Sequence, residues 1–162
     1  MIRFDLLKMV LYDFDDTLCI HTNHTSNEDQ VHRHEVDVLV HGKDTWNGGS
    51  INNHMKEFMK LCTKFGLRQG LISATTPHHS APKCEWVEAN YGIKLENFCV
   101  SRAEDKSRTM WAIKDAYNYR RDQVMIVDDY WKVLEMAANA GFQAYSPMQI
   151  VNYIASLRKG NM

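Results

Sequence analysis

Carboxylates gather at two places in the sequence, each directly after a short apolar run. They are Asp13, Asp15 and Asp16 in the segment MVLYDFDDTL, and Asp128 and Asp129 after VMIV. Carboxylates that converge in a fold repel one another and raise each other's pKa, so their convergence implies a bound cation. An all-oxygen ligand set favours Mg²⁺, which keeps several waters and is often held by one or two carboxylates together with a phosphate.

The Asp13–Asp15 spacing suits a two-step displacement at phosphorus. An aspartate beside Mg²⁺ can act as a nucleophile and form an aspartyl-phosphate. A second carboxyl two residues further on can protonate the leaving oxygen and later deprotonate the attacking water. A hydroxyl and a lysine would complete the contacts to the phosphoryl oxygens. The candidates for these last roles are Ser73 or the nearby Thr75 and Thr76, and Lys106 with Lys83 as its competitor.

Five short apolar runs predict buried parallel strands, because they are nearly continuous rather than alternating. They lie at residues 9–14, 67–73, 97–100, 124–127 and 143–145. Helical patterns occupy residues 51–65, 81–91, 107–119, 131–140 and the segment from 147 onward. This alternation predicts an α/β, Rossmann-like three-layer sandwich with right-handed crossovers. Reactive groups should then collect in the crevice at the carboxyl ends of the strands.

Four motifs in this order resemble the haloacid dehalogenase (HAD) superfamily. Asp13, Asp15 and Thr17 match its DxDxT signature, Ser73 its second motif, Lys106 its third and the pair Asp128/Asp129 its fourth. The resemblance extends from Met9 to about Tyr145. It implies a HAD-like fold, and the acid at position 15 favours phosphoryl transfer to water over dehalogenation.

The resemblance also implies roles for these residues. Asp13 would be the nucleophile and a Mg²⁺ ligand, and Asp15 the general acid/base whose backbone carbonyl also meets the metal. Asp128 would bind the metal directly and Asp129 through water. In the phosphate site, Ser73 with the adjacent Ala74 would bind the phosphoryl oxygens, and Lys106 would stabilise Asp13 and the transferred group.

Residues 19–50 depart from the strand–helix alternation. The segment is polar and rich in His and Asn, and residues 35–40 alternate enough to suggest a short strand. We interpret the chain as a single domain, residues 1–162, with a small insertion or flap at about 19–50, which resembles the capless or minimally capped branch of the family. His21, Trp46 and His78 are candidate substrate contacts, while a zinc site at His32 and His34 lacks further ligand spacing.

Composition excludes several classes of protein. With 19 Lys and Arg against 20 Asp and Glu, the net charge is −1, so extended nucleic-acid binding is not expected. The four cysteines are scattered, which favours reduced thiols. No stretch approaches the ~20 apolar residues of a membrane span. We expect a cytoplasmic protein whose partner is a phosphorylated substrate, with a neighbouring subunit as one way to close an open site.

Two hypotheses follow. The leading one is a Mg²⁺-dependent phosphatase that works through an aspartyl-phosphate on Asp13. The alternative is a catalytically idle HAD-like module that binds phosphate or a partner. A receiver domain would need an isolated phosphoacceptor aspartate after the third strand, where this chain has Val100 and Ser101.

Overall fold

A sheet of five parallel strands, in the order β5-β4-β1-β6-β7, forms the centre of the protein. The structure, a computed structural model, describes residues 2–21 and 49–160. The strands are β1 (Met9–Tyr12), β4 (Arg68–Ala74), β5 (Glu96–Val100), β6 (Val124–Val127) and β7 (Gln143–Tyr145). The predicted parallel α/β sheet is confirmed, although the first strand ends two residues earlier than expected.

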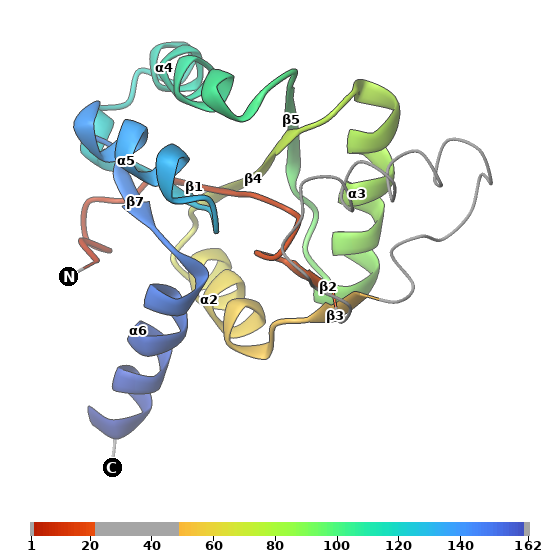
Figure 1. Ribbon diagram of the computed structural model, residues 1–162. Coiled ribbons are helices and arrows are strands. Elements are labelled where there is room, and N and C mark those ends of the chain that lie inside the picture. The colour runs from red at the N-terminus through yellow and green to blue at the C-terminus, as the bar shows by residue number, and fades with distance from the viewer. Residues whose placement is uncertain (1, 22–48, 161–162) are drawn as a thin grey trace.

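Helices cover both faces of this sheet. They are α2 (Asn53–Lys64), α3 (Pro77–Tyr91), α4 (Lys106–Ala116), α5 (Trp131–Asn139) and α6 (Pro147–Gly160). Alternate side chains of β1 enter two separate cores, Val10 with α2, α3 and α6, and Leu11 with α4 and α5. Figure 1 shows α4 and α5 together on one side of the sheet and α2 and α6 on the other. None of these described helices is long and apolar enough to cross a membrane.

The strand order places a crevice between β1 and β6. Counted along the chain, the sheet has the order 3-2-1-4-5, so the crossovers run in opposite directions on the two sides of β1. Ligands of open α/β sheets bind at the carboxyl ends of the strands at such a switch point. A receiver domain has the order 2-1-3-4-5 instead, so the topology argues against that function independently of the missing aspartate.

Three helices begin at residues other than those predicted, namely α2, α3 and, by a single residue, α4. Helix α3 starts at Pro77, after Thr76, so Pro82 lies inside it rather than in its first turn. A proline is well tolerated at the first helical position because its missing N–H would have no partner there. Helix α2 is capped by Asn52, whose Oδ1 accepts hydrogen bonds from the backbone N–H groups of His54 (3.1 Å) and Met55 (3.2 Å).

A small antiparallel pair lies at the two edges of the predicted insertion. Strands β2 (Cys19–His21) and β3 (Gly49–Ile51) form a separate two-stranded sheet. The rest of the insertion, with the predicted strand at 35–40, Trp46 and the histidines at 32 and 34, lies outside the described residues. The single-domain organisation with a flap stays a prediction.

Candidate active site

The chain turns sharply after β1, and this turn carries the first aspartates. The backbone N–H of Asp13 donates to the Val127 carbonyl of β6 (2.9 Å), so Asp13 still lies in the sheet. The Phe14 carbonyl then accepts from the N–H groups of Leu18 (3.0 Å) and Cys19 (2.9 Å). Asp16 has a φ of 58°, a left-handed conformation that aspartate adopts more readily than most residues. The turn therefore holds Asp13 and Asp15 in a defined place.

Three carboxylates form an acidic cluster, Asp13, Asp128 and Asp129, at the carboxyl ends of β1 and β6. One oxygen of each lies within 4.8 Å of the others. Asp13 and Asp128 are buried, Asp129 is exposed, and Asp128 Oδ1 accepts a hydrogen bond from the Tyr130 N–H (2.9 Å). Burial raises the pKa of Asp13 to about 8, with the neighbouring carboxylates adding to the rise against the opposing charge of Lys106. This all-oxygen set fits Mg²⁺, whose charge would relieve that repulsion.

Lys106, the first residue of α4, connects the two buried members of the acidic cluster. Its Nζ donates to Asp13 Oδ1 and to Asp128 Oδ2, each at 2.7 Å. Burial disfavours the ammonium charge, but Asp13 and Asp128 outweigh it and raise the pKa of Lys106. The lysine is therefore a fixed positive charge beside the predicted nucleophile.

Asp15 has different partners. Its Oδ1 lies 3.0 Å from His21 Nε2, and its Oδ2 accepts a hydrogen bond from Lys83 Nζ (2.8 Å). The same Nζ donates to Ser73 Oγ (3.1 Å) at the end of β4. Burial by itself would raise the pKa of Asp15, but the His21 hydrogen bond and the Lys83 charge hold it at about 2. Asp15 is therefore ionised at neutral pH in the ligand-free protein.

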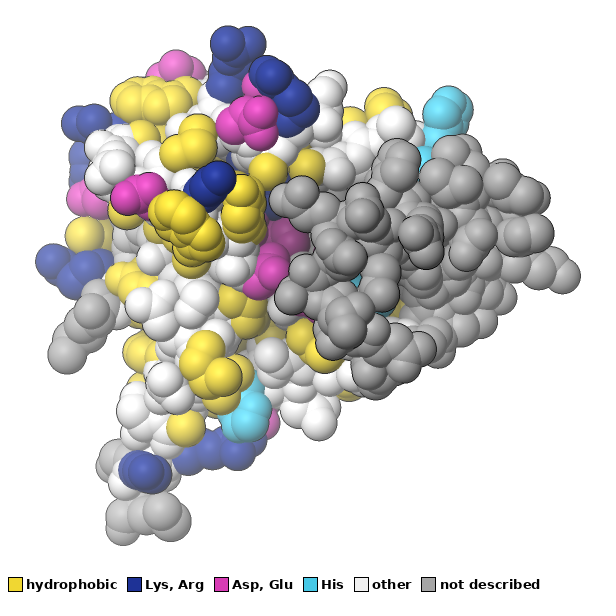
Figure 2. Space-filling view, viewed as in Figure 1, with side chains coloured by type: hydrophobic (Ala, Val, Ile, Leu, Met, Phe, Trp, Pro, Cys, Tyr) yellow, Lys and Arg dark blue, Asp and Glu magenta, His cyan; other side chains and the backbone are white. Residues whose placement is uncertain are grey.

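A hollow of about 330 Å³ opens between these groups. The acidic cluster lines one part of it with Asp15 and Asp16, and the rest is lined by Ser73, Ala74, Ala103, Lys106 and Tyr130. Figure 2 shows acidic side chains reaching the surface beside hydrophobic ones on this face of the molecule. Trp131 follows Tyr130 and is 61% exposed at the start of α5. As the described residues define it, the hollow is large enough for a small phosphorylated group.

The structure brings seven predicted site residues to this hollow, namely Asp13, Asp15, Ser73, Ala74, Lys106, Asp128 and Asp129. The substrate-contact candidates are placed differently. His21 contacts the Asp15 carboxylate, and His78 is exposed in the first turn of α3 without lining the hollow. Among the alternatives to Ser73, Thr75 is buried and does not line the hollow, and Thr76 precedes α3 as its N-cap residue.

Lys83 contacts the site more closely than its place in the sequence predicted. We expected a single functional lysine, but two lysines are buried among the described residues. Lys83 pairs with Asp15, and Lys106 pairs with Asp13 and Asp128. The sequence contained a sign of this role. Lys83 is spaced at helical intervals from His79, Val87 and Tyr91, and these residues form the buried face of α3. A lysine on such a face needs a buried partner.

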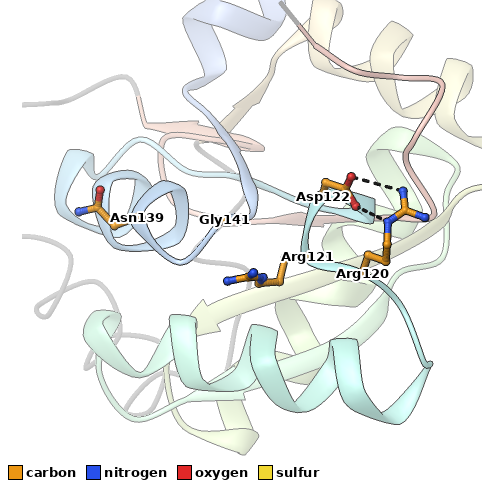
Figure 3. A pocket seen from close by; sticks show the side chains of 5 residues that line it. All are labelled: Arg120, Arg121, Asp122, Asn139 and Gly141. Atoms are coloured by element: carbon orange, nitrogen blue, oxygen red, sulfur yellow. Dashed lines mark hydrogen bonds and ion pairs between the residues drawn. The ribbon is translucent and has the colours of Figure 1, made fainter.

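A second hollow lies at the opposite end of the sheet, around the start of β6. Figure 3 shows its lining residues Arg120, Arg121, Asp122, Asn139 and Gly141. The Arg120 Nε is paired with Asp122 Oδ1 (3.0 Å), while Arg121 Nη1 donates to the Ala140 carbonyl (3.2 Å). These cations are used in local contacts, and the hollow contains no cluster of catalytic groups among the described residues.

Comparison with known proteins relates this arrangement to a fold family. No family model matches the sequence, and no curated protein matches it either. Solved structures do match. A HAD family enzyme from Bacteroides thetaiotaomicron, solved with magnesium and inorganic phosphate, aligns with a TM-score of 0.52 and 13% identity over 86% of this chain and 93% of its own. This chain has the haloacid dehalogenase fold.

A second solved structure aligns with a similar share of this chain. The deoxy-D-mannose-octulosonate 8-phosphate phosphatase from Haemophilus influenzae, in a cobalt-bound form, aligns with a TM-score of 0.53 and 15% identity. The match covers 88% of this chain and 69% of that protein. At such low identity the likeness concerns the fold, so the chemistry has to be argued from the residues of this chain.

Proposed function

We propose that the protein is a Mg²⁺-dependent phosphatase that hydrolyses a phosphomonoester through an aspartyl-phosphate on Asp13. The observation that carries this proposal is the buried Lys106, which bridges Asp13 and Asp128 beside a hollow that also contains Asp15 and Ser73. Asp13, Asp128 and Asp129 would hold the cation, which would offset phosphoryl charge and polarise the phosphorus for attack.

The first step transfers the phosphoryl group to the protein. Asp13 would lose its proton when the cation binds; a carboxylate oxygen of Asp13 then attacks phosphorus, and the bond from phosphorus to the leaving oxygen breaks. Ser73 and Lys106 stabilise the phosphoryl oxygens, and Asp15 gives a proton to the leaving alcohol. Asp15 is ionised before substrate binds, so the proton must be taken up in the complex, where the negative phosphate raises its pKa.

The second step releases phosphate. Asp15, now a carboxylate, takes a proton from water as the water oxygen attacks phosphorus. The bond between phosphorus and the Asp13 oxygen breaks, which returns Asp13 to its ionised form. One carboxyl group thus serves as acid and then as base, as its position two residues after the nucleophile allows.

The two structural neighbours support this chemistry without defining the substrate. One was solved with magnesium and inorganic phosphate, and the other is named as a phosphatase of a phosphorylated sugar acid. The catalytic set of this chain fits sugar phosphates, nucleotides, phosphoproteins and phosphorylated nucleic-acid ends alike.

The test is a panel of phosphomonoesters from these four classes, with 4-nitrophenyl phosphate as a generic member, assayed with Mg²⁺ and with a chelator. We expect Mg²⁺-dependent phosphate release that is lost in Asp13→Asn and retained in Asp115→Asn, an exposed aspartate remote from the hollow. Tight Mg²⁺ binding without turnover across the panel would favour the idle binding module instead.

A further inference from the structure

Lys83 is a charged side chain with no exposed surface, and stability does not explain it. Its side chain is 0% exposed in α3, and its Nζ lies 5.1 Å from the Phe14 ring centroid. Burying an ammonium group carries a desolvation cost, and apolar replacements of buried ion pairs are often neutral or stabilising. The lysine therefore calls for an explanation in the site that it contacts.

The first contact holds Asp15 between two partners. Lys83 Nζ donates to Oδ2 (2.8 Å), and His21 Nε2 lies 3.0 Å from Oδ1. Partners on both oxygens restrict rotation of the carboxylate about its last bond. The contact also joins residues 68 positions apart, so it ties the turn after β1 to helix α3.

The second contact determines which way the Ser73 hydroxyl can donate. An ammonium group has no lone pair, so in the 3.1 Å contact Ser73 Oγ must accept from Lys83 Nζ. The proton of that hydroxyl then stays available for a second partner. Because Ser73 lines the hollow, a phosphoryl oxygen bound there is the natural acceptor.

From these contacts we infer that Lys83 is a positioning residue, which orients the Asp15 carboxylate and directs the Ser73 hydroxyl toward the phosphoryl group. The inference rests on the proposed function, since it assigns Lys83 to the same site. The two buried lysines then have separate roles. Lys106 acts on the nucleophile and the metal ligands, and Lys83 acts on the acid/base and the phosphate-binding hydroxyl.

The test for the Asp15 contact uses 4-nitrophenyl phosphate with Mg²⁺. This leaving group departs without protonation, so kcat reports on Asp15 as the base for water. We expect Asp15→Asn to lower kcat about 100-fold or more and Lys83→Met to lower it about tenfold or more. In the double variant, Lys83→Met should add only the smaller loss that comes from its Ser73 contact, because the Asp15 carboxylate that it orients is already gone.

The test for the Ser73 contact uses inorganic phosphate as a competitive inhibitor. Lys83→Met should weaken phosphate binding severalfold in the wild-type background and have little further effect in a Ser73→Ala background. Val87→Ala, on the same buried face of α3, is the control for a purely structural effect. It should lower the melting temperature while leaving kcat and phosphate binding unchanged. If Lys83→Met does not fold, Lys83→Gln replaces it.

The outcomes separate the two claims. Wild-type kcat and phosphate binding in Lys83→Met, with Asp15→Asn impaired, would overturn the role of Lys83 and leave the phosphatase proposal standing. If Lys83→Met lowers kcat as much in the Asp15→Asn background as in the wild type, its role in orienting Asp15 is overturned, because the whole effect would then be independent of Asp15. Wild-type kcat in Asp15→Asn would instead contradict the proposed mechanism itself.

Discussion

Two groups of polar side chains, each with buried members, lie next to β1, and they differ in charge and in how completely their polar atoms are paired. Beneath α2, the neutral cluster of Tyr12, Thr63 and Gln69 is fully hydrogen bonded. Gln69 Oε1 accepts from the Tyr12 hydroxyl (2.8 Å), and Gln69 Nε2 donates to Thr63 Oγ1 (2.9 Å). Residue Asp13, one position beyond Tyr12, belongs to the acidic cluster, which has three carboxylates and one bridging lysine.

This difference in charge and pairing indicates that the neutral cluster serves stability and the acidic cluster serves function. A neutral network in which donors and acceptors are matched contributes to stability and to a single packing arrangement. Carboxylates that are buried together repel one another, and that arrangement is retained where function needs it. We therefore expect changes in the acidic cluster to cost activity and changes in the neutral cluster to cost stability.

Among these variants, Asp13→Asn should show the largest opposite changes in activity and stability. Loss of the nucleophile should reduce Mg²⁺-dependent turnover about 1,000-fold or more. Removal of a buried carboxylate should at the same time raise the metal-free free energy of unfolding by about 1 kcal/mol. Urea unfolding with a chelator and steady-state kinetics with Mg²⁺ measure the two effects. A variant that is both inactive and less stable would break the proposed contrast.

The acidic cluster should also make metal-free stability depend on pH. The pKa of Asp13 is about 8 in the folded protein against an ordinary 3.8, so between these values the folded state keeps a proton that the unfolded chain has released. The free energy of unfolding should therefore fall as pH rises from about 4 to about 8, by up to roughly 1.4 kcal/mol per pH unit.

Thermal melts across that range, with and without Mg²⁺, test this dependence. Mg²⁺ should stabilise the protein more at pH 8 than at pH 5, because it binds ionised carboxylates. Without metal, the stability of Asp13→Asn should depend less steeply on pH than that of the wild type. A wild-type stability that rises with pH in the absence of metal would show that Asp13 is not protonated in the folded state.

In the neutral cluster we expect a smaller effect in the opposite direction, a loss of stability with activity retained. Gln69→Ala leaves the Tyr12 hydroxyl without its 2.8 Å acceptor and should lower the free energy of unfolding by about 2 kcal/mol. Tyr12→Phe, a milder change, should cost about 1 kcal/mol. In both variants kcat should stay within about twofold of wild type. A large loss of kcat at unchanged stability would mean that this cluster also serves the reaction.

Sequence reasoning succeeded where the pattern is local or follows from the geometry of a parallel sheet. Asp13 and Asp128 each follow a continuous apolar strand, and parallel strands place such ends at one edge. Lys83 was harder to place, because its contact with Asp15 depends on how α3 packs against the turn after β1. The start of α3 was also missed, since two prolines compete for the first turn and the sequence alone did not choose Pro77.

The most direct test of the central claim is the mass of the protein after acid quenching during turnover. Asp15→Asn should slow hydrolysis of the intermediate, so this variant is incubated with Mg²⁺ and 4-nitrophenyl phosphate. We predict a mass increase of one phosphoryl group, located by peptide mapping at Asp13, removed by hydroxylamine and absent from the Asp13→Asn/Asp15→Asn variant. Release of 4-nitrophenol with the phosphoryl group on another residue, or an adduct that persists without Asp13, would contradict the account.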